Sequence, residues 1–352
     1  MFPVICRGAD SYTTGRPLKD YQGHFFRMIF LTPRPQNPVV VLYYLMQKGQ
    51  GMERLMIIYF RLKRAVLHIA DLFIPTKIAK KNFVSWATFP RFCLKPNKTA
   101  YNKTINIAFC FNERYVPLAL TAISSLLENS PACKYDIYCV TDITKQSQTK
   151  FAKYISAQYS NGSVIFLKPN HDYDTAHCGR WPRAIWWRCM LPKLLPDTVD
   201  RIIYTDVDTL FVRDLREAND FDLGDNLLAG CFDSPTYINS GFLIMNIAQI
   251  RHENKYPEMI HWAENNKTNY PDQDMLNTTC RGRIKPISRK FNVIVDGGYS
   301  FLKTMNATQY RDMRHPVMLH YAGKIKPWDM TIKHFFTFSI YRKYYKTVLN
   351  NY

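Results

Sequence analysis

Between residues 104 and 204, short apolar runs alternate with segments whose apolar residues recur at helical spacing. Short apolar runs bounded by turn residues are typical of buried strands, and repeats at i, i+3 and i+4 predict amphipathic helices. The pattern predicts strands at 105–111, 135–140, 164–167 and 201–204, and helices at 116–127, 146–159 and 181–195. Strands separated by helices imply an α/β fold with a Rossmann-like, mostly parallel sheet flanked by helices.

The segments on either side of residues 104–328 have a different pattern. Residues 1–51 lack clean periodicity, and we expect a poorly patterned N-terminal extension there. Residues 52–103 predict a basic amphipathic helix, to about residue 73, and then a linker with several Pro and Lys residues. Residues 329–352 predict a basic aromatic C-terminal tail. The expected organisation is therefore one α/β domain at 104–328 between two basic flanks.

The net charge of +19 belongs to those flanks and not to the body of the chain. Residues 1–100 contain 16 Lys and Arg against 4 Asp and Glu, and residues 324–352 contain 6 against 1. The 223 residues between them contain 25 against 23. A near-neutral body argues against nucleic-acid binding, and flanks that interleave basic and aromatic residues favour an anionic membrane surface. A solvated helix packed on its own domain is the alternative for each flank.

The expected location is cytoplasmic, peripheral on the cytoplasmic face of a membrane. No stretch has the ~18 consecutive apolar residues that a transmembrane helix needs. Asp10 and Asp20 precede the longest apolar run, so we expect no cleaved signal peptide. Nine cysteines without a Cys-x-x-Cys pair favour reduced thiols. Six Asn-x-Ser/Thr sequons leave open the alternative of a protein in the lumen of the secretory pathway.

The most informative motif for chemistry follows the strand predicted at 201–204. The chain passes there from an apolar run into Asp206, Val207 and Asp208. Side chains alternate along an extended chain, so carboxylates at i and i+2 point the same way. Two adjacent carboxylates are costly unless a cation lies between them, and a hard divalent cation is the natural one. The alternative for this short motif is a surface turn at the end of a strand.

Three further segments support a site for a metal and a diphosphate. Asn239, Ser240 and Gly241 precede an apolar run, and glycine there allows the backbone to approach a polar ligand closely. Asp272 and Gln273 stand at a predicted helix start, where Asp272 could instead be a helix N-cap. His320, Gly323 and Lys326 offer an imidazole ligand, a close approach and a cation for phosphate.

Arg188 is a charged residue on the otherwise apolar helix predicted at 181–195, so we expect it to have a buried anionic partner.

The sequence contains no Gly-x-Gly-x-x-Gly and no Walker motif, which argues against a dinucleotide reductase or a P-loop protein. Ligands of parallel α/β sheets lie at the carboxyl ends of strands, and Asn112 and Asp206 follow two such ends.

In this order, these motifs resemble glycosyltransferase family 8, the retaining transferases that include glycogenin and bacterial lipooligosaccharide galactosyltransferases. The resemblance covers residues 104–328. It consists of the opening strand, the Asp-x-Asp of Asp206 and Asp208, the segment 222–226, Asn239-Ser240-Gly241, Asp272-Gln273-Asp274, and His320-x-x-Gly323-x-x-Lys326-Pro327-Trp328. It implies a GT-A type fold and a retaining transfer of galactose or glucose from a UDP-sugar to a glycan or glycolipid acceptor, such as lipopolysaccharide.

The resemblance also assigns roles to individual residues. Asp206, Asp208 and His320 would bind Mn²⁺, with Mg²⁺ as the other candidate, and the metal would hold the diphosphate. Gly323 and Lys326 would bind the phosphates from the other side. Gln273 and Asp272 would be catalytic. The other donor contacts would come from Ala108, Phe109, Cys110, Asn112, Arg188, Val207, Asn239 and Ser240.

Two interpretations remain open beside the cytoplasmic enzyme: a lumenal transferase of the same family and a non-catalytic binding protein that keeps the GT-A fold.

The sequence also departs from the family pattern. Asn112 stands where the bacterial galactosyltransferases commonly have Asp, which puts the nucleotide contacts of that loop in question. Residues 170–181, at the place of a donor lid, leave the choice between galactose and glucose open. Front-face attack by the acceptor is favoured over a covalent intermediate, because the amide of Gln273 is a poor nucleophile.

Overall fold

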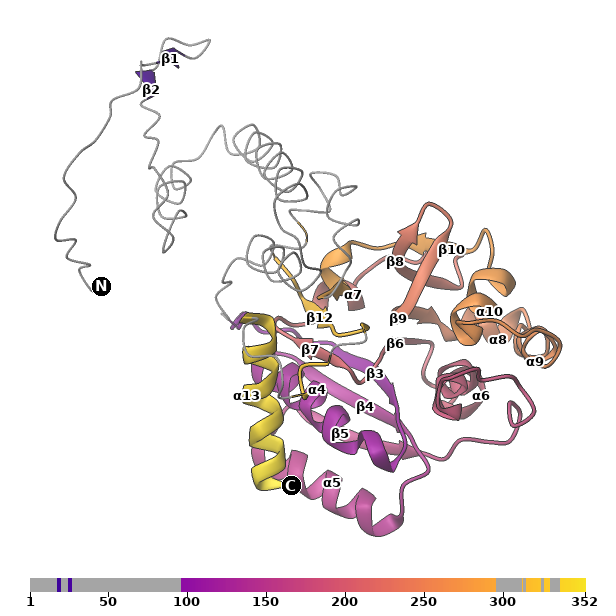
Figure 1. Ribbon diagram of the computed structural model, residues 1–352, viewed down its shortest axis with the longest axis horizontal. Helices are drawn as coiled ribbons and strands as arrows, with labels where there is room; N and C mark the ends of the chain where they lie inside the picture. Colours follow the sequence, from indigo (N-terminus) through magenta and orange to yellow (C-terminus); the bar gives the residue numbers. More distant parts are fainter. Residues whose placement is uncertain are drawn as a thin grey trace, which may run out of the picture. The chain divides into compact units, whose positions relative to one another are not determined.

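The computed structural model describes residues 96–295, 312, 315–323, 326–329 and 336–352, together with strands β1 (Leu18–Lys19) and β2 (Phe25–Phe26) (Figure 1). The chain divides into two units, Met1–Tyr59 and Phe60–Tyr352. In the first unit, β1 and β2 form an antiparallel pair. The amphipathic helix predicted at 52–73 lies outside the described residues.

A seven-stranded sheet forms the centre of the second unit. In order across the sheet, its strands are β10 (Ile284–Pro286), β8 (Leu228–Ser234), β9 (Tyr237–Asn246), β6 (Arg201–Thr205), β3 (Thr104–Cys110), β4 (Lys134–Val140) and β5 (Gly162–Leu167). Only β9 runs antiparallel to its two neighbours; the other pairings are parallel. The predicted mostly parallel α/β sheet is confirmed, and the four predicted strands are present with slightly shifted ends.

Helices cover both faces of this sheet, which explains the apolar runs of its central strands. On β3, Ile105, Ile107 and Phe109 pack in one core with the helices α4 and α5, whereas Ala108 and Cys110 pack in a second core on the other face. Among the described residues of the second unit, the helices are η2 (Glu113–Tyr115), α4 (Val116–Asn129), α5 (Lys145–Gln158), η3 (Arg183–Met190), α6 (Leu191–Leu194), α7 (Arg216–Asn219), α8 (Ile247–His252), α9 (Tyr256–Asn265), α10 (Pro271–Thr279), η4 (Arg289–Phe291) and α13 (Phe336–Asn351).

The segment predicted as one α-helix at 181–195 is instead the 3₁₀-helix η3 followed by the short α6. Pro192 has no N–H to donate to the carbonyl of Arg188, as an α-helix would require, and the N–H of Leu191 donates to that carbonyl in the tighter pattern. Pro182 also limits the start, because η3 begins directly after it. The apolar spacing predicted a helix correctly, but it did not predict the type.

A three-stranded sheet brings the C-terminal part of the domain to the end of β6. Its strands are β11 (Val293–Ile294), β12 (Met318–His320) and β7 (Thr209–Phe211). Strands β12 and β7 are antiparallel, with His320 opposite Thr209. Because Thr209 follows Asp208 directly, this register places His320 beside the Asp-x-Asp motif.

Helix α13 packs on α4 along the side of the domain (Figure 1). Phe338 and Tyr341 are buried, and Asn129 of α4 donates to the hydroxyl of Tyr344 at 2.9 Å. These two aromatic side chains belong to the core of the domain and are not available to a lipid surface, so the alternative of a helix packed on its own domain holds for α13. Contact of the basic flanks with an anionic membrane stays a prediction. None of the described helices combines the length and the hydropathy that crossing a bilayer requires.

Candidate active site

The end of strand β6 presents the two carboxylates of the Asp-x-Asp motif. The N–H of Asp206 donates to the carbonyl of Gly241 at 3.1 Å, and the carbonyl of Asp208 accepts from the N–H of Tyr321 at 2.9 Å. The motif is thus fixed by backbone bonds to β9 on one side and to the segment after β12 on the other. Both side chains keep part of their surface exposed, 25% for Asp206 and 21% for Asp208.

His320 completes a group of three metal-ligating side chains. Its Nε2 lies 3.2 Å from Oδ1 of Asp208 and 3.7 Å from Oδ2 of Asp206. One ligand atom from each of the three residues lies within 4.8 Å of the others. Two carboxylates and an imidazole suit a divalent cation such as Mn²⁺, which accepts oxygen and nitrogen ligands. The structure therefore brings together the three residues predicted as metal ligands.

Asn292 holds His320 in the orientation that a metal requires. The N–H of Gly241 donates to the side chain of Asn239 at 3.0 Å, which identifies the accepting atom as the amide oxygen Oδ1. The same oxygen accepts from the amide nitrogen Nδ2 of Asn292 at 2.8 Å. The carbonyl oxygen of Asn292 is then left to face Nδ1 of His320, at 2.8 Å. Nδ1 carries the proton in this bond, and Nε2 is directed to the carboxylates.

Gly241 lies so close to the imidazole that any side chain at this position would collide with it. A Cβ at this position would lie 2.2 Å from Cε1 of His320 and 2.7 Å from Nδ1. The close approach is a packing requirement, since the backbone of Gly241 is not in the left-handed region. The glycine that the sequence suggested for approach to a ligand makes room for His320 in this structure.

Arg188 has the buried anionic partner that its position predicted, Asp272, and a second, partly exposed one, Asp206. Its Nη2 lies 2.8 Å from Oδ1 of Asp206, and its Nε lies 3.3 Å from Oδ2 of Asp272. Nη1 donates to the carbonyl of Ser240 at 2.9 Å. The guanidinium also lies 4.5 Å from the ring centroid of Tyr204, whose hydroxyl donates to Asp206 at 2.6 Å. Arg188 thus links the metal-ligating carboxylate to the start of α10.

Asp272 and Gln273 lie in the first turn of α10, which has Tyr270 as its N-cap residue. The side-chain oxygen of Gln273 accepts from the N–H of Ser240 at 3.0 Å, and the hydroxyl of Ser240 donates to Asp272 at 3.1 Å. Burial raises the pKa of Asp272, and the adjacent Arg188 opposes that rise. Asp272 is an ion-pair partner and not the helix N-cap that its position allowed.

Lys326 approaches the site from the opposite side. Its Nζ lies 2.8 Å from Oδ2 of Asp208 and donates to the carbonyl of Tyr321 at 2.6 Å. Burial tends to raise the pKa of Asp208, but the cationic neighbours His320 and Lys326 hold this pKa well below its ordinary value. Burial likewise tends to lower the pKa of His320, and the carboxylates of Asp208 and Asp206 raise it above its ordinary value. Gly323 lies in the same segment as Lys326 and is partly buried.

The residues predicted to hold the nucleotide lie at the carboxyl end of β3. Phe109 is fully buried on the α4 side of the sheet, so only its backbone is available to a ligand there. Ala108 and Cys110 are buried on the opposite face. Oδ1 of Asn112 is buried and has no hydrogen-bond partner among the described residues, which leaves an acceptor for a ligand N–H. Val207 is partly buried and packs against the first core.

Sequence reasoning missed two residues of this site. Tyr204 was assigned only to an apolar strand, although its ring contacts the guanidinium of Arg188 and its hydroxyl donates to Asp206. Asn292 follows η4 and carried no signal in the sequence, because its role depends on the fold bringing β9 and β12 together.

Comparison with known proteins gives the same family as the motifs. The chain matches glycosyl transferase family 8 over residues 106–331. It is 26% identical over 260 residues to a Haemophilus influenzae protein assigned as a glycosyltransferase, covering 66% of this chain and 76% of that protein. It is 24% identical over 277 residues to the lipopolysaccharide 1,2-glucosyltransferase of Escherichia coli K12, covering 71% and 79%.

A solved structure supports the fold independently. The galactosyltransferase LgtC, solved with donor and acceptor sugar analogues, superposes with a TM-score of 0.58 at 20% sequence identity, covering 69% of this chain and 96% of that one. At this identity the likeness concerns the GT-A-like fold alone. The family match spans most of the described domain and includes every residue of the candidate site. The chain therefore belongs to glycosyl transferase family 8, and it is a glycosyltransferase.

Proposed function

We propose that this chain transfers galactose or glucose from a UDP-sugar to a glycan acceptor, with retention of the anomeric configuration. The observation that carries the proposal is the convergence of Asp206 and Asp208, between β6 and β7, with His320 of β12, so that their ligand atoms lie within 4.8 Å of one another. Mn²⁺ is the proposed cofactor, with Mg²⁺ as the alternative. When bound, the cation would neutralise charge that develops on the diphosphate leaving group.

The residues around this group suit a diphosphate. Lys326 pairs with Asp208 in the present structure, and its flexible side chain can turn to a phosphate once a cation has neutralised that carboxylate. Asn112 offers the unpartnered acceptor that a uracil N–H would satisfy. Asn112 follows β3, and Lys326 follows β12. A bound nucleotide diphosphate would therefore reach from Asn112, at the uracil, to the metal ligands and Lys326, at the phosphates.

The donor sugar is proposed to lie near Arg188, Asp272 and Gln273. Asp272 is held by the guanidinium of Arg188 and by the hydroxyl of Ser240, which makes it a fixed charge rather than a free nucleophile. The carbonyl of Gln273 is oriented by the N–H of Ser240 and could stabilise positive charge at the anomeric carbon. An amide is a poor nucleophile, so this arrangement supports front-face attack by the acceptor over a covalent intermediate.

For the acceptor, we propose a surface glycan such as lipopolysaccharide. The support is the printed function of relatives: the Escherichia coli protein is a lipopolysaccharide glucosyltransferase, and another relative in Salmonella typhimurium is a lipopolysaccharide 1,3-galactosyltransferase. These names leave the transferred sugar and the linkage open, because the two relatives differ in both.

Attachment to the cytoplasmic face of an anionic membrane remains a proposal that rests on the charge of residues 1–100. Exposed Lys343 and Lys346 of α13 could add to it without any insertion of aromatic rings. A lumenal location would place glycans on the sequons. Asn277 is not available for this in the folded protein, because its amide bonds the backbone of Ile238 and Gln273.

The test is a donor screen with the full chain. UDP-galactose, UDP-glucose and, as comparison, GDP-mannose are incubated with Mn²⁺, and release of the nucleoside diphosphate is measured with and without a lipopolysaccharide core acceptor. The proposal expects release from one or both UDP-hexoses only, with an α-linked product by NMR, as retention of an α-configured donor requires. Binding of these donors without any turnover would instead favour a non-catalytic protein with this fold.

A further inference from the structure

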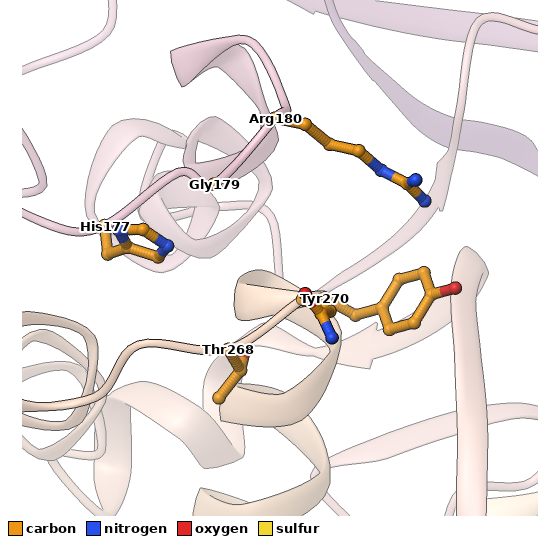
Figure 2. Close-up of a pocket in the computed structure, with 6 residues that line it drawn as sticks. His177, Gly179, Arg180, Thr268 and Tyr270 are labelled. Atoms are coloured by element: carbon orange, nitrogen blue, oxygen red, sulfur yellow. The ribbon is translucent and has the colours of Figure 1, made fainter.

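Two loops that lead into the active site enclose a pocket of about 300 Å³ (Figure 2). One loop joins β5 to η3, and the other joins α9 to α10. The lining residues, which define what we call the interloop pocket, are His177, Gly179, Arg180, Thr268, Asn269 and Tyr270. The indole N–H of Trp181 donates to the carbonyl of Asn269 at 2.8 Å and joins the two loops.

The polar groups of the interloop pocket suit an anion. Arg180 is exposed, and its guanidinium lies 4.8 Å from the ring centroid of Trp181. Within the described part of the chain, no carboxylate pairs with Arg180 and none lines the pocket. The guanidinium of Arg180 and the partly exposed imidazole of His177 thus border the pocket without a counter-charge among its lining residues.

The same pocket has an aromatic wall. Tyr270 is 48% exposed, and its ring centroid lies 6.2 Å from that of Trp181. Figure 2 shows the side chains of Arg180 and Tyr270 extending toward the same side of the pocket. An exposed aromatic face beside hydrogen-bond donors suits an amphipathic ligand such as a sugar ring, which has apolar C–H faces and polar edges.

Both walls of the interloop pocket continue into the active site. Tyr270 is the N-cap residue of α10, and its carbonyl accepts from the N–H of Asp274 at 2.8 Å, one residue beyond Gln273. Trp181 lies two residues before η3, which carries Arg188. A ligand in this pocket would therefore border the proposed position of the donor sugar, where an acceptor must be held.

We propose that the interloop pocket binds the acceptor and selects a glycan with an anionic substituent, a phosphate or a carboxylate, through Arg180. This inference rests on the proposed function and adds the chemical class of the acceptor. The anionic group would pair with the guanidinium of Arg180, and the sugar ring that carries it would lie on Tyr270. Neither contact uses the metal ligands, so acceptor selection is separable from donor binding.

The experiment compares three probes on the full chain with UDP and Mn²⁺ present: methyl β-galactoside, its 6-phosphate and methyl galacturonide. Binding is followed by saturation-transfer NMR and titration. Each charged probe is expected to bind roughly threefold to fivefold more tightly than the neutral one, the upper part of the range for one exposed but well-oriented charge pair. The two charged probes distinguish phosphate from carboxylate. Inorganic phosphate alone should bind more weakly than the phosphorylated sugar, because it lacks the ring contact with Tyr270.

Arg180→Ala should reduce that preference to within about twofold, and Arg180→Lys should retain part of it. The matched control is Lys267→Ala, which removes an exposed positive charge from the same loop without lining the pocket and should leave the preference unchanged. Equal affinities of the wild type for all three probes, no binding of any probe, or an unchanged preference in Arg180→Ala would overturn the proposal. Release of UDP by the wild type, measured separately, tells whether the proposed function has failed instead.

Discussion

Substituting alanine for Gly241 tests whether His320 belongs to the metal site. The new Cβ would lie 2.2 Å from Cε1 of His320, whereas ordinary contacts of this kind begin at 3.4 Å. The imidazole or the strand must therefore move by about 1 Å. The ring is 3% exposed and held at 2.8 Å by Asn292, so it has little room to move and keep that bond.

Two effects of different size are expected from Gly241→Ala. Overpacking a buried site typically costs about 1–3 kcal/mol of stability. Displacing His320 should lower Mn²⁺ affinity at least as much as loss of a residue that orients a ligand, about 10–100-fold. That range corresponds to about 1.4–2.7 kcal/mol of binding free energy. The assay is an electron paramagnetic resonance titration of free Mn²⁺ at fixed protein and UDP concentrations, after circular dichroism has established that the variant folds.

Gly162→Ala is the matched control in the same sheet. Its Cβ would meet the two terminal methyl groups of Leu127 at 2.8 Å, so it overpacks the core in a similar way. Because Gly162 lies on the edge strand β5 and contacts no site residue, stability should fall while Mn²⁺ affinity stays at the wild-type value. A folded Gly241→Ala protein with wild-type Mn²⁺ affinity would refute the placement of His320 as a ligand.

Three further predictions concern single side chains. Asn292→Ala should lower Mn²⁺ affinity by about 10–100-fold in the same titration, because Nδ1 of His320 loses its acceptor; an unchanged affinity would mean that the bond does not orient the ring. Gln273→Ala should lower kcat far more than it raises the donor KM in steady-state kinetics, and the opposite split would make Gln273 a ground-state binding residue. Tyr341→Ala should lower the free energy of unfolding in urea by about 3–5 kcal/mol, because the ring of Tyr341 is buried against Tyr321 and Trp328. A change of under about 1 kcal/mol would contradict that packing.

The parallel α/β core could be predicted from the sequence because its signals are local. Residues 105–111 and 135–140 are apolar runs long enough to identify buried strands, and the apolar spacing after residue 116 identifies a helix. The type of η3 could not be predicted from spacing alone, since the effect of Pro192 on the carbonyl of Arg188 depends on which helical hydrogen bond the turn adopts.

The site was predictable where a motif supplied chemistry in one place, as at Asp206 and Asp208. It was not predictable where the role depends on contacts between distant segments. Asn292 acts through Asn239 and His320, and these residues meet only because β12 pairs with β7 and β9 lies beside β6. Phe338 and Tyr341 had the same composition as a lipid-binding face, and only tertiary packing distinguishes the two uses of an aromatic, basic helix.

We propose that Asp206, Asp208 and His320 hold the divalent cation that turnover of a UDP-hexose requires. The most direct measurement is UDP release by the wild-type chain with Mn²⁺, after EDTA, and after Mn²⁺ is restored, beside the same series for Asp208→Asn. Release should disappear in EDTA, return with Mn²⁺, and be at least about 10–100-fold lower in the variant when Mn²⁺ is present. Wild-type release that persists in EDTA, or a variant as active as the wild type, would contradict it.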